Sequence, residues 1–214
     1  MAAFRRVYEN HLVVEDIYPG MARRFAQAGV ERFAEIGGGR GPISRLLAAG
    51  GVHTCVVDLD TQMLAETSGP AVRADLRALP LADASVDGVA TVNCLYFLER
   101  PIEALREARR VLRGGGTFVA SSPSRWNNTE LEGIDPEWGS ASPFDSEDAP
   151  DLVAAVFGDV EVEPWRLVAY VLPDREAIAD YLHAFNVPDW QTKALDIEPP
   201  LSITKVGAQV WARG

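Results

Sequence analysis

The stretch AEIGGGRGPIS, from Ala34 to Ser44, constrains this chain more than any other part of its sequence. A short apolar run ends at Ile36, four glycines and one arginine follow, and a helical pattern opens at Pro42. Glycine loses more conformational freedom on folding than any other residue, so this cluster needs a compensating reason. A glycine turn between a strand and the N-terminus of a helix lets backbone amides approach a ligand closely. We therefore expect a ligand site at this turn.

Strand-like and helix-like segments alternate along the whole chain. Residues 189–200 are expected to be irregular, and the helix of residues 102–113 is expected to end at Gly114. This alternation predicts βαβ units and a mostly parallel sheet covered by helices on both faces, with one of the two late strands antiparallel. The expected strands cover residues 30–36, 53–59, 70–76, 86–95, 116–122, 160–172 and 201–214, and the expected helices cover residues 16–29, 41–50, 60–67, 102–113, 146–157 and 174–186, with Asp16, Asp60 and Asp174 near their starts.

Composition narrows the kind of partner. The chain is 47% hydrophobic and 24% charged, as ordinary globular proteins are, and its formal net charge is -11. That charge argues against nucleic acids and against anionic membrane surfaces as partners. The first 20 residues lack an apolar core of signal-peptide length, and Cys55 and Cys94 lie in apolar, strand-like runs. These features predict a reduced, cytoplasmic protein without a disulfide or a metal site.

The glycine loop differs from the dinucleotide-binding pattern G-x-G-x-x-G. Gly37 and Gly39 fit its first two positions, but Pro42 occupies the third, and Gly41 stands one residue earlier. Asp58 closes the second expected strand, 21 residues after Gly37, where a carboxylate accepts both hydroxyls of a ribose. The loop therefore indicates a nucleoside site. The structural alternative is a tight turn between strand and helix, followed by a capping aspartate.

Four stretches, taken in order, resemble a known enzyme family. They are EIGGGRG, VVDLDTQML, ADLRALPLADASVDGVATVN and EALREARRVLRGGGTFVAS, and they fall within residues 34–122. The chain resembles class I S-adenosylmethionine-dependent methyltransferases, in the branch of the ubiquinone- and menaquinone-biosynthesis enzymes (methyltransferase type 11).

The resemblance implies a Rossmann-like α/β fold in three layers, with a seven-stranded, mostly parallel sheet whose last strand is antiparallel. It implies one methyltransferase domain over residues 1–214, with a helical cap at 1–30 and a substrate-side loop at 123–150. The implied reaction is methyl transfer from S-adenosylmethionine to a small-molecule acceptor by in-line displacement, leaving S-adenosylhomocysteine.

The resemblance also implies the residues that contact the cofactor. The glycines lie against its methionine part, Glu35 orients the loop and binds the amino group, Asp58 takes the ribose hydroxyls, and Leu59 and Met63 pack on the adenine. Asp75 and the backbone of Leu76 meet the adenine ring, and Asn93 lies near the reacting methyl group. The full implied set is Glu35, Gly37, Gly39, Gly41, Asp58, Leu59, Met63, Asp75, Leu76 and Asn93.

One departure from the family concerns the stretch after the fourth expected strand. Many relatives carry His or Glu there, whereas this chain reads NCLYFLER and has Tyr96 and Phe97. Aromatic faces attract a sulfonium or a cationic substrate, and Tyr96 could face either the pocket or the core. A side-chain base is needed only if the acceptor must lose a proton with the transfer, and the candidates are His11, Tyr96 and His183.

The acceptor-binding segments carry no motif. Arg125 and Trp126 follow the fifth expected strand, at the edge where ligands bind in open α/β sheets, and Tyr8 and Tyr18 are candidates to close the pocket. A solvated loop arginine beside an anchoring tryptophan is the plain alternative for the first pair. Two other functions stay open: a nicotinamide-dependent oxidoreductase, and a protein that binds S-adenosylmethionine without turnover. The sequence leaves open the acceptor, the methylated atom and the oligomeric state.

Overall fold

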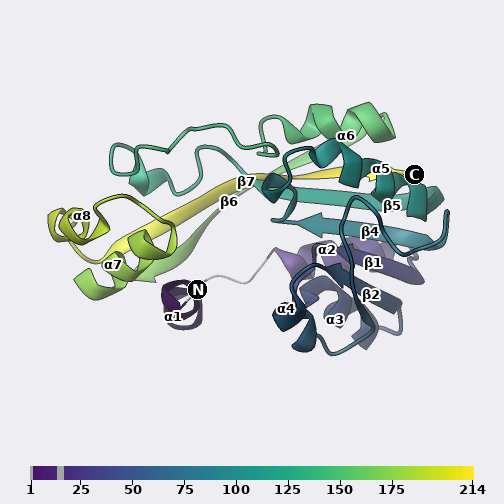
Figure 1. Cartoon of the computed structure of the whole chain (residues 1–214), viewed down its shortest axis with the longest axis horizontal. Coiled ribbons are helices and arrows are strands. Elements are labelled where there is room, and N and C mark those ends of the chain that lie inside the picture. The colour runs from purple at the N-terminus through teal and green to yellow at the C-terminus, as the bar shows by residue number, and fades with distance from the viewer. Residues whose placement is uncertain (1, 14–16) are drawn as a thin grey trace. The chain divides into compact units, whose positions relative to one another are not determined.

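The structure, a computed structural model, describes residues 2–13 and 17–214. Seven strands form one sheet in the order β3-β2-β1-β4-β5-β7-β6 (Figure 1). The first five strands pair in parallel. Strands β5 and β7 are antiparallel. The backbone amide near the start of β5, Gly115, donates to the carbonyl of Gly214 after the end of β7, whereas the amide of Ser124 after β5 donates to Val206 in the middle of β7. The strands are β1 (Arg32–Ile36), β2 (His53–Asp58), β3 (Ala71–Arg73), β4 (Val86–Val92), β5 (Leu112–Pro123), β6 (Val160–Leu172) and β7 (Leu201–Arg213). The predicted α/β fold with an antiparallel last strand is confirmed.

The chain divides into two compact units, and each is described by itself. Unit 1 comprises residues 1–15, 123–140 and 164–207, and unit 2 comprises residues 16–122, 141–163 and 208–214. The single domain over residues 1–214 stays a prediction. Unit 2 contains α2 (Tyr18–Gln27), α3 (Pro42–Ala49), α4 (Thr61–Ala65), α5 (Pro101–Val111), α6 (Ala149–Phe157) and the 3₁₀ turn η1 (Leu95–Phe97), and unit 1 contains α1 (Ala2–His11), α7 (Arg175–Ala184), α8 (Trp190–Asp196) and the 3₁₀ turn η2 (Thr129–Leu131).

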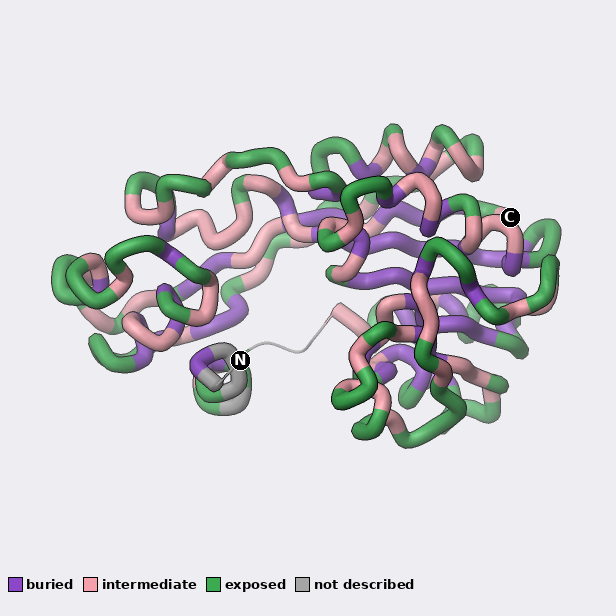
Figure 2. Tube along the Cα trace, viewed as in Figure 1, coloured by how far each residue is buried: buried purple, intermediate pink, exposed green. Residues whose placement is uncertain are grey.

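The central strands β1 and β4 of unit 2 are buried along almost their whole length, as Figure 2 shows by their purple colour, whereas β2 and β3 are only partly buried. Neighbouring residues of a strand point to opposite faces of the sheet. On β1, Phe33 packs with Phe25 of α2 in one apolar cluster, whereas Ala34 and Ile36 join Leu105 of α5 in another. Helices therefore cover both faces of this part of the sheet, which gives the three layers expected from the sequence.

Unit 1 has its own apolar core, centred on the fully buried Tyr181 of α7. Val7 of α1 and Ala194 of α8 also belong to this core. The N-terminal helix is tied to α7 by Arg6, whose guanidinium donates to both carboxylate oxygens of Asp180 at 2.5 and 2.6 Å. Unit 1 is therefore stabilised by its own apolar core and by its own two-point ion pair.

Several elements differ from the sequence prediction in their bounds. Residues 189–200 were expected to be irregular, but α8 forms there because Ala194 is buried and the Trp190 ring stacks on His183 at 4.7 Å. The helix expected to reach Gly114 ends at Val111, because Leu112 is already buried as the first residue of β5. Cys94, expected within a strand, follows the end of β4. Asp16, the expected start of α2, lies outside the described residues.

The buried carboxylate of Asp87 on β4 provides a test of this core. Its Oδ2 accepts hydrogen bonds from the backbone amides of Glu31 and Arg32 at 3.0 and 3.1 Å, and its Oδ1 pairs with Arg113 at 3.0 Å. Asp87→Ala leaves these donors unpaired, and we expect it to lower the free energy of unfolding by about 1–3 kcal/mol in urea titrations.

The matched control is Asp83, whose side chain is 80% exposed and pairs with Arg110 at the surface. Asp83→Ala is expected to cost about 0–1 kcal/mol, as exposed ion pairs do. Equal losses in the two variants would contradict a structural role for Asp87.

Candidate functional site

The glycine loop after β1 has a backbone that only glycine adopts readily. Gly37, Gly39 and Gly41 have φ angles of 65°, 54° and 69°, in the left-handed region. The amide of Gly37 donates to the carbonyl of Val57 at 2.7 Å, which fastens the start of the loop to β2. The amide of Gly41 donates to the carbonyl of Gly38 at 2.8 Å, which closes the turn before α3.

The chain's own atoms surround these glycines. A Cβ on Gly37 would overlap the Sγ of Cys94 and lie 2.7 Å from its Cβ, and one on Gly41 would lie 2.6 Å from Val56 Cγ2. A Cβ on Gly39 would lie 3.0 Å from Met63 Sδ. The sequence interpretation assigned the missing side chains to a ligand, but internal packing alone already requires glycine at Gly37 and Gly41.

Glu35 lies beneath the first turn of α3. It is 1% exposed, and its two carboxylate oxygens accept the backbone amides of Ile43 at 3.2 Å and Ser44 at 2.7 Å. Burial raises the pKa of Glu35, while the bonds from Ser44 and Ile43 oppose that rise. The carboxylate thus satisfies helix N-terminal amides that would otherwise lack partners. This geometry agrees with the predicted orienting role, and the contact with a cofactor amino group stays a prediction.

Asp58, the last residue of β2, is held by two backbone amides. Its Oδ2 accepts from Gly39 at 2.8 Å and its Oδ1 accepts from Asp60 at 2.8 Å. An ionised carboxylate offers about four lone-pair positions, so acceptor capacity remains on both oxygens. The side chain is half-buried, and therefore oriented, with part of its surface left exposed. A fixed acceptor of this kind suits the two hydroxyls of a ribose.

An apolar surface lies next to Asp58. Asp60 caps α4 as predicted, because its Oδ1 accepts from the amides of Gln62 at 2.8 Å and Met63 at 3.2 Å. The helix start places half-buried Met63 beside Gly39, while Leu59 is 53% exposed. An exposed leucine beside a half-buried methionine suits the face of a planar apolar ring.

Asp75 has a partner that the sequence interpretation missed. Arg77 donates to both of its oxygens, with the shortest distance 2.6 Å, and its backbone amide donates at 2.9 Å. The hydrogen bonds from Arg77 lower the pKa of Asp75 to about 2. The carboxylate is therefore ionised at neutral pH and able to accept a donor such as an exocyclic amine. Leu76 beside it is buried in the core.

The residues after β4 separate into core and surface positions. Asn93 has a φ of 53° and is exposed. Its backbone amide donates to the backbone carbonyl of Ser121 at 2.9 Å. Tyr96 packs against the core, and burial raises its pKa to about 12, which disfavours it as a proton acceptor at neutral pH. Burial likewise raises the pKa of Cys94 to about 12. Of the two aromatic residues noted in this stretch from the sequence, Phe97 is the exposed one, at 78%.

The structure gathers the whole predicted cofactor set in unit 2. The end of β1 pairs with β2 through Ile36 and Val57, and β2 pairs with β3 through Asp58 and Arg73, so the loops that follow lie at one edge of the sheet. Tyr18 also belongs to unit 2, where it packs against the core. The base candidate Tyr96 is in unit 2 as well, and the remaining acceptor-side and base candidates belong to unit 1, namely Tyr8, His11, Arg125, Trp126 and His183.

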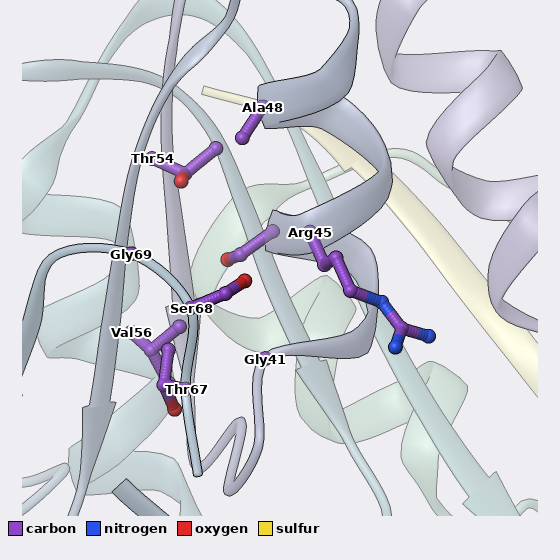
Figure 3. Close-up of a pocket in the computed structure, with 9 residues that line it drawn as sticks. Gly41, Arg45, Ala48, Thr54, Val56, Thr67, Ser68 and Gly69 are labelled. Atoms are coloured by element: carbon purple, nitrogen blue, oxygen red, sulfur yellow. The ribbon is translucent and has the colours of Figure 1, made fainter. Parts of the chain in front are cut away.

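A small cavity behind the loop is separate from this edge (Figure 3). Its volume is about 30 Å³, enough for a single water molecule. It shares one residue, Gly41, with the predicted cofactor set. The cavity is lined by Gly41, Ser44, Arg45, Ala48, Thr54, Val56, Thr67, Ser68 and Gly69.

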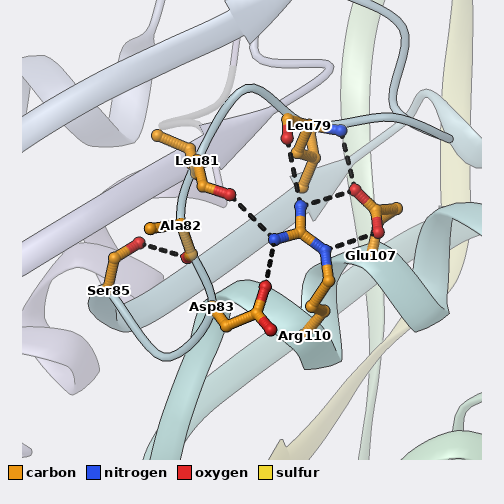
Figure 4. A network of polar contacts seen from close by, with 7 residues as sticks. All are labelled: Leu79, Leu81, Ala82, Asp83, Ser85, Glu107 and Arg110. Carbon is orange, nitrogen blue, oxygen red and sulfur yellow. Dashed lines mark hydrogen bonds and ion pairs between the residues drawn. The ribbon is translucent and has the colours of Figure 1, made fainter.

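Arg110 of α5 fixes the segment that follows Asp75 and Leu76 (Figure 4). Its guanidinium donates to the carbonyls of Leu81 at 2.8 Å and Leu79 at 3.0 Å, and to Glu107 at 2.7 Å. The carboxylate of Glu107 in turn accepts the amide of Leu79 at 2.8 Å. This network anchors the segment around Leu79 and Leu81 on a helix of the core.

The structure also bears on metal sites and on membrane spans. Within residues 2–13 and 17–214, no three His, Cys, Asp or Glu side chains gather as metal ligands would. No helix in these ranges is long and apolar enough to cross a membrane.

Comparisons with known proteins agree with this geometry. Residues 34–120 match the family described as a methyltransferase domain. A ubiquinone/menaquinone biosynthesis C-methyltransferase of Rubrivivax gelatinosus is 34% identical over 131 residues, which cover 55% of this chain and 52% of that protein. The enzyme of the same name from Methylobacterium nodulans is 30% identical over 182 residues, which cover 74% of this chain and 70% of that protein.

A solved structure extends the likeness of the fold over nearly the whole chain. The YcgJ protein of Bacillus subtilis superposes with a TM-score of 0.65 at 15% identity, covering 92% of this chain and 98% of that one. At this identity the likeness concerns the fold alone. The chain spans about half the length of the Rubrivivax relative and of the enzyme of the same name from Ruegeria.

Gly37 offers a test of the loop geometry. Gly37→Ala adds a Cβ that overlaps Cys94 at a positive φ, whereas Gly51→Ala adds one at a φ of 89° with no atom within 4 Å. Both variants carry the backbone cost of about 1 kcal/mol, and Gly37→Ala is expected to lose about 1–3 kcal/mol more from overpacking, measured by urea unfolding.

A double-mutant cycle with Cys94→Ala, which removes the Sγ that the new Cβ would overlap, completes this test. Cys94→Ala in the Gly37→Ala background is expected to recover stability relative to the sum of the two single losses. Additive losses would show that the glycine is not needed for packing against Cys94.

Proposed function

This chain belongs to the S-adenosylmethionine-dependent methyltransferase family, and we propose that it transfers the methyl group of that cofactor to a small-molecule acceptor. The observation that carries the proposal is the position of Asp58. Its carboxylate is oriented by the amides of Gly39 and Asp60 and keeps acceptor capacity at the edge where the glycine loop lies. The residues present therefore fit an adenosyl group.

Each residue of the edge has a role in this proposal. Asp58 accepts the ribose hydroxyls, exposed Leu59 and Met63 cover the adenine face, and ionised Asp75 accepts the adenine amine. The loop glycines and Glu35 hold the methionine part, and Asn93 lies toward the methyl group. The Arg110 network keeps Leu76 and the segment after it in place, so that binding does not have to order it.

The chemistry needs little from the chain beyond binding. The cofactor supplies a methyl group already activated by the sulfonium, which an acceptor attacks in line, opposite the sulfur. Positioning the two reactants and excluding water then account for most of the acceleration. His11 and His183 remain the proposed bases if the acceptor must lose a proton. The buried position of Tyr96 makes it the weaker choice.

We propose that the methyl acceptor is a small molecule that contains a ring. We also propose that neither a nucleic acid nor a membrane is a partner of this protein. The net charge of -11 disfavours nucleic acids, and the two relatives described above are named as methyltransferases of quinone biosynthesis. Carbon methylation of a quinol ring is accordingly the first acceptor chemistry to test. Arg125, Trp126, Tyr8 and Tyr18 are the proposed acceptor contacts, and a cytoplasmic location accords with this role.

The two alternatives make different predictions. A nicotinamide-dependent oxidoreductase would need a third glycine where this chain has Pro42, and family membership argues against it. A protein that binds the cofactor without turnover would hold S-adenosylhomocysteine but release no methyl group. Transfer of label from methyl-labelled cofactor to a panel of quinols and phenols separates that protein from an enzyme.

Replacement of Asp58 tests the cofactor site. Asp58→Ala removes the acceptor for the ribose hydroxyls, and we expect it to weaken S-adenosylhomocysteine binding by about 10–100-fold in calorimetry, the loss of one or two hydrogen bonds to a charged group.

The control is Asp60→Asn, because asparagine caps a helix about as well as aspartate and the backbone amide that holds Asp58 is retained. Its affinity should stay close to that of the unmodified chain. Unchanged affinity in the Asp58→Ala variant would refute the proposed ribose contact.

A further inference from the structure

Lys205 on β7 has an unusual environment within unit 1. It is one of two lysines among the 20 lysine and arginine residues of the chain. Its Nζ lies 4.2 Å from the ring centroid of Phe185, 5.4 Å from that of Tyr181 and 5.6 Å from that of Tyr170. The residue is half-buried, so part of it remains accessible. Rings from β6 and α7 thus surround an amine carried by β7.

The other lysine shows what an ordinary structural lysine does in this unit. The Nζ of Lys193 on α8 donates to the carbonyl of Ile134 at 2.7 Å. Within residues 2–13 and 17–214, no hydrogen bond or ion pair holds the Nζ of Lys205, and three aromatic rings lie beside it. A partly desolvated cationic amine without an acceptor is costly, so the site favours either a neutral amine or an incoming anion.

Glu130 is the acid whose charge acts on Lys205, but its carboxylate oxygens are bonded elsewhere. Glu130 of η2 accepts the backbone amide of Thr204 at 2.7 Å and its hydroxyl at 2.5 Å, so its oxygens are directed at Thr204. Tyr181 donates its hydroxyl to Asn128 at 2.8 Å. The ionisable groups beside Lys205 are thus Glu130, whose charge acts on it, Tyr170 on β6 and Tyr181 on α7, and burial raises the pKa of Tyr181 well above its ordinary value.

Burial lowers the pKa of Lys205 to about 7, with Glu130 opposing the shift. Neutral and charged forms are then both populated near neutral pH. Only a lysine can work in this way, because an arginine keeps its proton under all ordinary conditions. The aromatic faces stabilise the ammonium once it forms, because their rings attract a cation.

We propose that the accessible parts of Lys205 and Phe185 form a binding site for a weakly acidic aromatic ligand, such as a phenol, whose proton Lys205 accepts. The O–H bond of the ligand breaks and its electron pair stays on the oxygen. The lone pair of Nζ takes the proton, which leaves a phenolate beside an ammonium. The half-buried ring of Phe185 contacts the ligand, while the buried rings of Tyr170 and Tyr181 contact the cation. The site uses residues of unit 1 and needs no cofactor.

The probe is 4-nitrophenol, whose ionised form absorbs visible light. Binding to the full chain should raise its absorbance at a pH where the free phenol is partly protonated. Lys205→Met should weaken this binding about tenfold or more, the factor expected for one charge-assisted hydrogen bond. Lys193→Met, the matched control, should retain it. Equal binding by the unmodified chain and Lys205→Met, or no spectral shift with the unmodified chain, would overturn the proposal.

The pH profile separates proton acceptance from simple charge attraction. The complex shares one proton between phenol and amine, so its affinity should fall on both sides of neutral pH. Lys205→Arg keeps the cation but cannot release its proton, so its affinity should rise with phenol ionisation and then stay level at high pH. A falling limb at high pH in the arginine variant, or its absence in the unmodified chain, would contradict the proposal.

Thermal unfolding followed by circular dichroism shows that each variant is folded. Should Lys205→Met fail to fold, the two profiles of the unmodified chain and Lys205→Arg still decide. Calorimetry with S-adenosylhomocysteine on the same samples reports the cofactor site separately. The phenol site and the proposed methyl transfer can therefore fail independently.

Discussion

The structure of unit 2 depends on two carboxylates that accept the backbone amides of the glycine loop and of the helix behind it. Glu35 accepts hydrogen bonds from the first-turn amides of α3. Asp58, at the end of the neighbouring strand β2, accepts one from the amide of Gly39. Such amides would otherwise be without partners at the end of a buried strand. The turn at the head of β1 is thereby fixed before any ligand binds, and the same interactions orient Asp58 toward the open edge of the sheet.

Much of this arrangement could be predicted from the sequence because it is local. A short apolar run that ends in a glycine turn identifies a strand such as β1, and capping residues such as Asp60 and Asp174 mark helix boundaries. The contacts that escaped prediction join distant parts of the chain. Cys94 lies behind Gly37, and α8 forms because Trp190 and Ala194 pack on unit 1. No pattern within a short window encodes such contacts.

The two units carry different chemistry. Unit 2 holds acids directed by backbone amides, a glycine turn and an exposed leucine, which together suit a nucleoside. Unit 1 holds an amine among aromatic rings, from residues that lie 20 to 35 positions before Lys205 in the sequence and share no motif with it. Lys205 follows a strand pattern like any other residue of β7, so its environment emerges only once Tyr170, Tyr181 and Phe185 are brought beside it.

The central claim is that the edge of unit 2 holds an adenosyl group through Asp58. A crystal structure of the full chain with S-adenosylhomocysteine tests it most directly. The account predicts both ribose hydroxyls within hydrogen-bond distance of the Asp58 carboxylate, with the bond from the amide of Gly39 kept. A nucleoside bound elsewhere, or an Asp58 side chain turned away from the ribose, would contradict it.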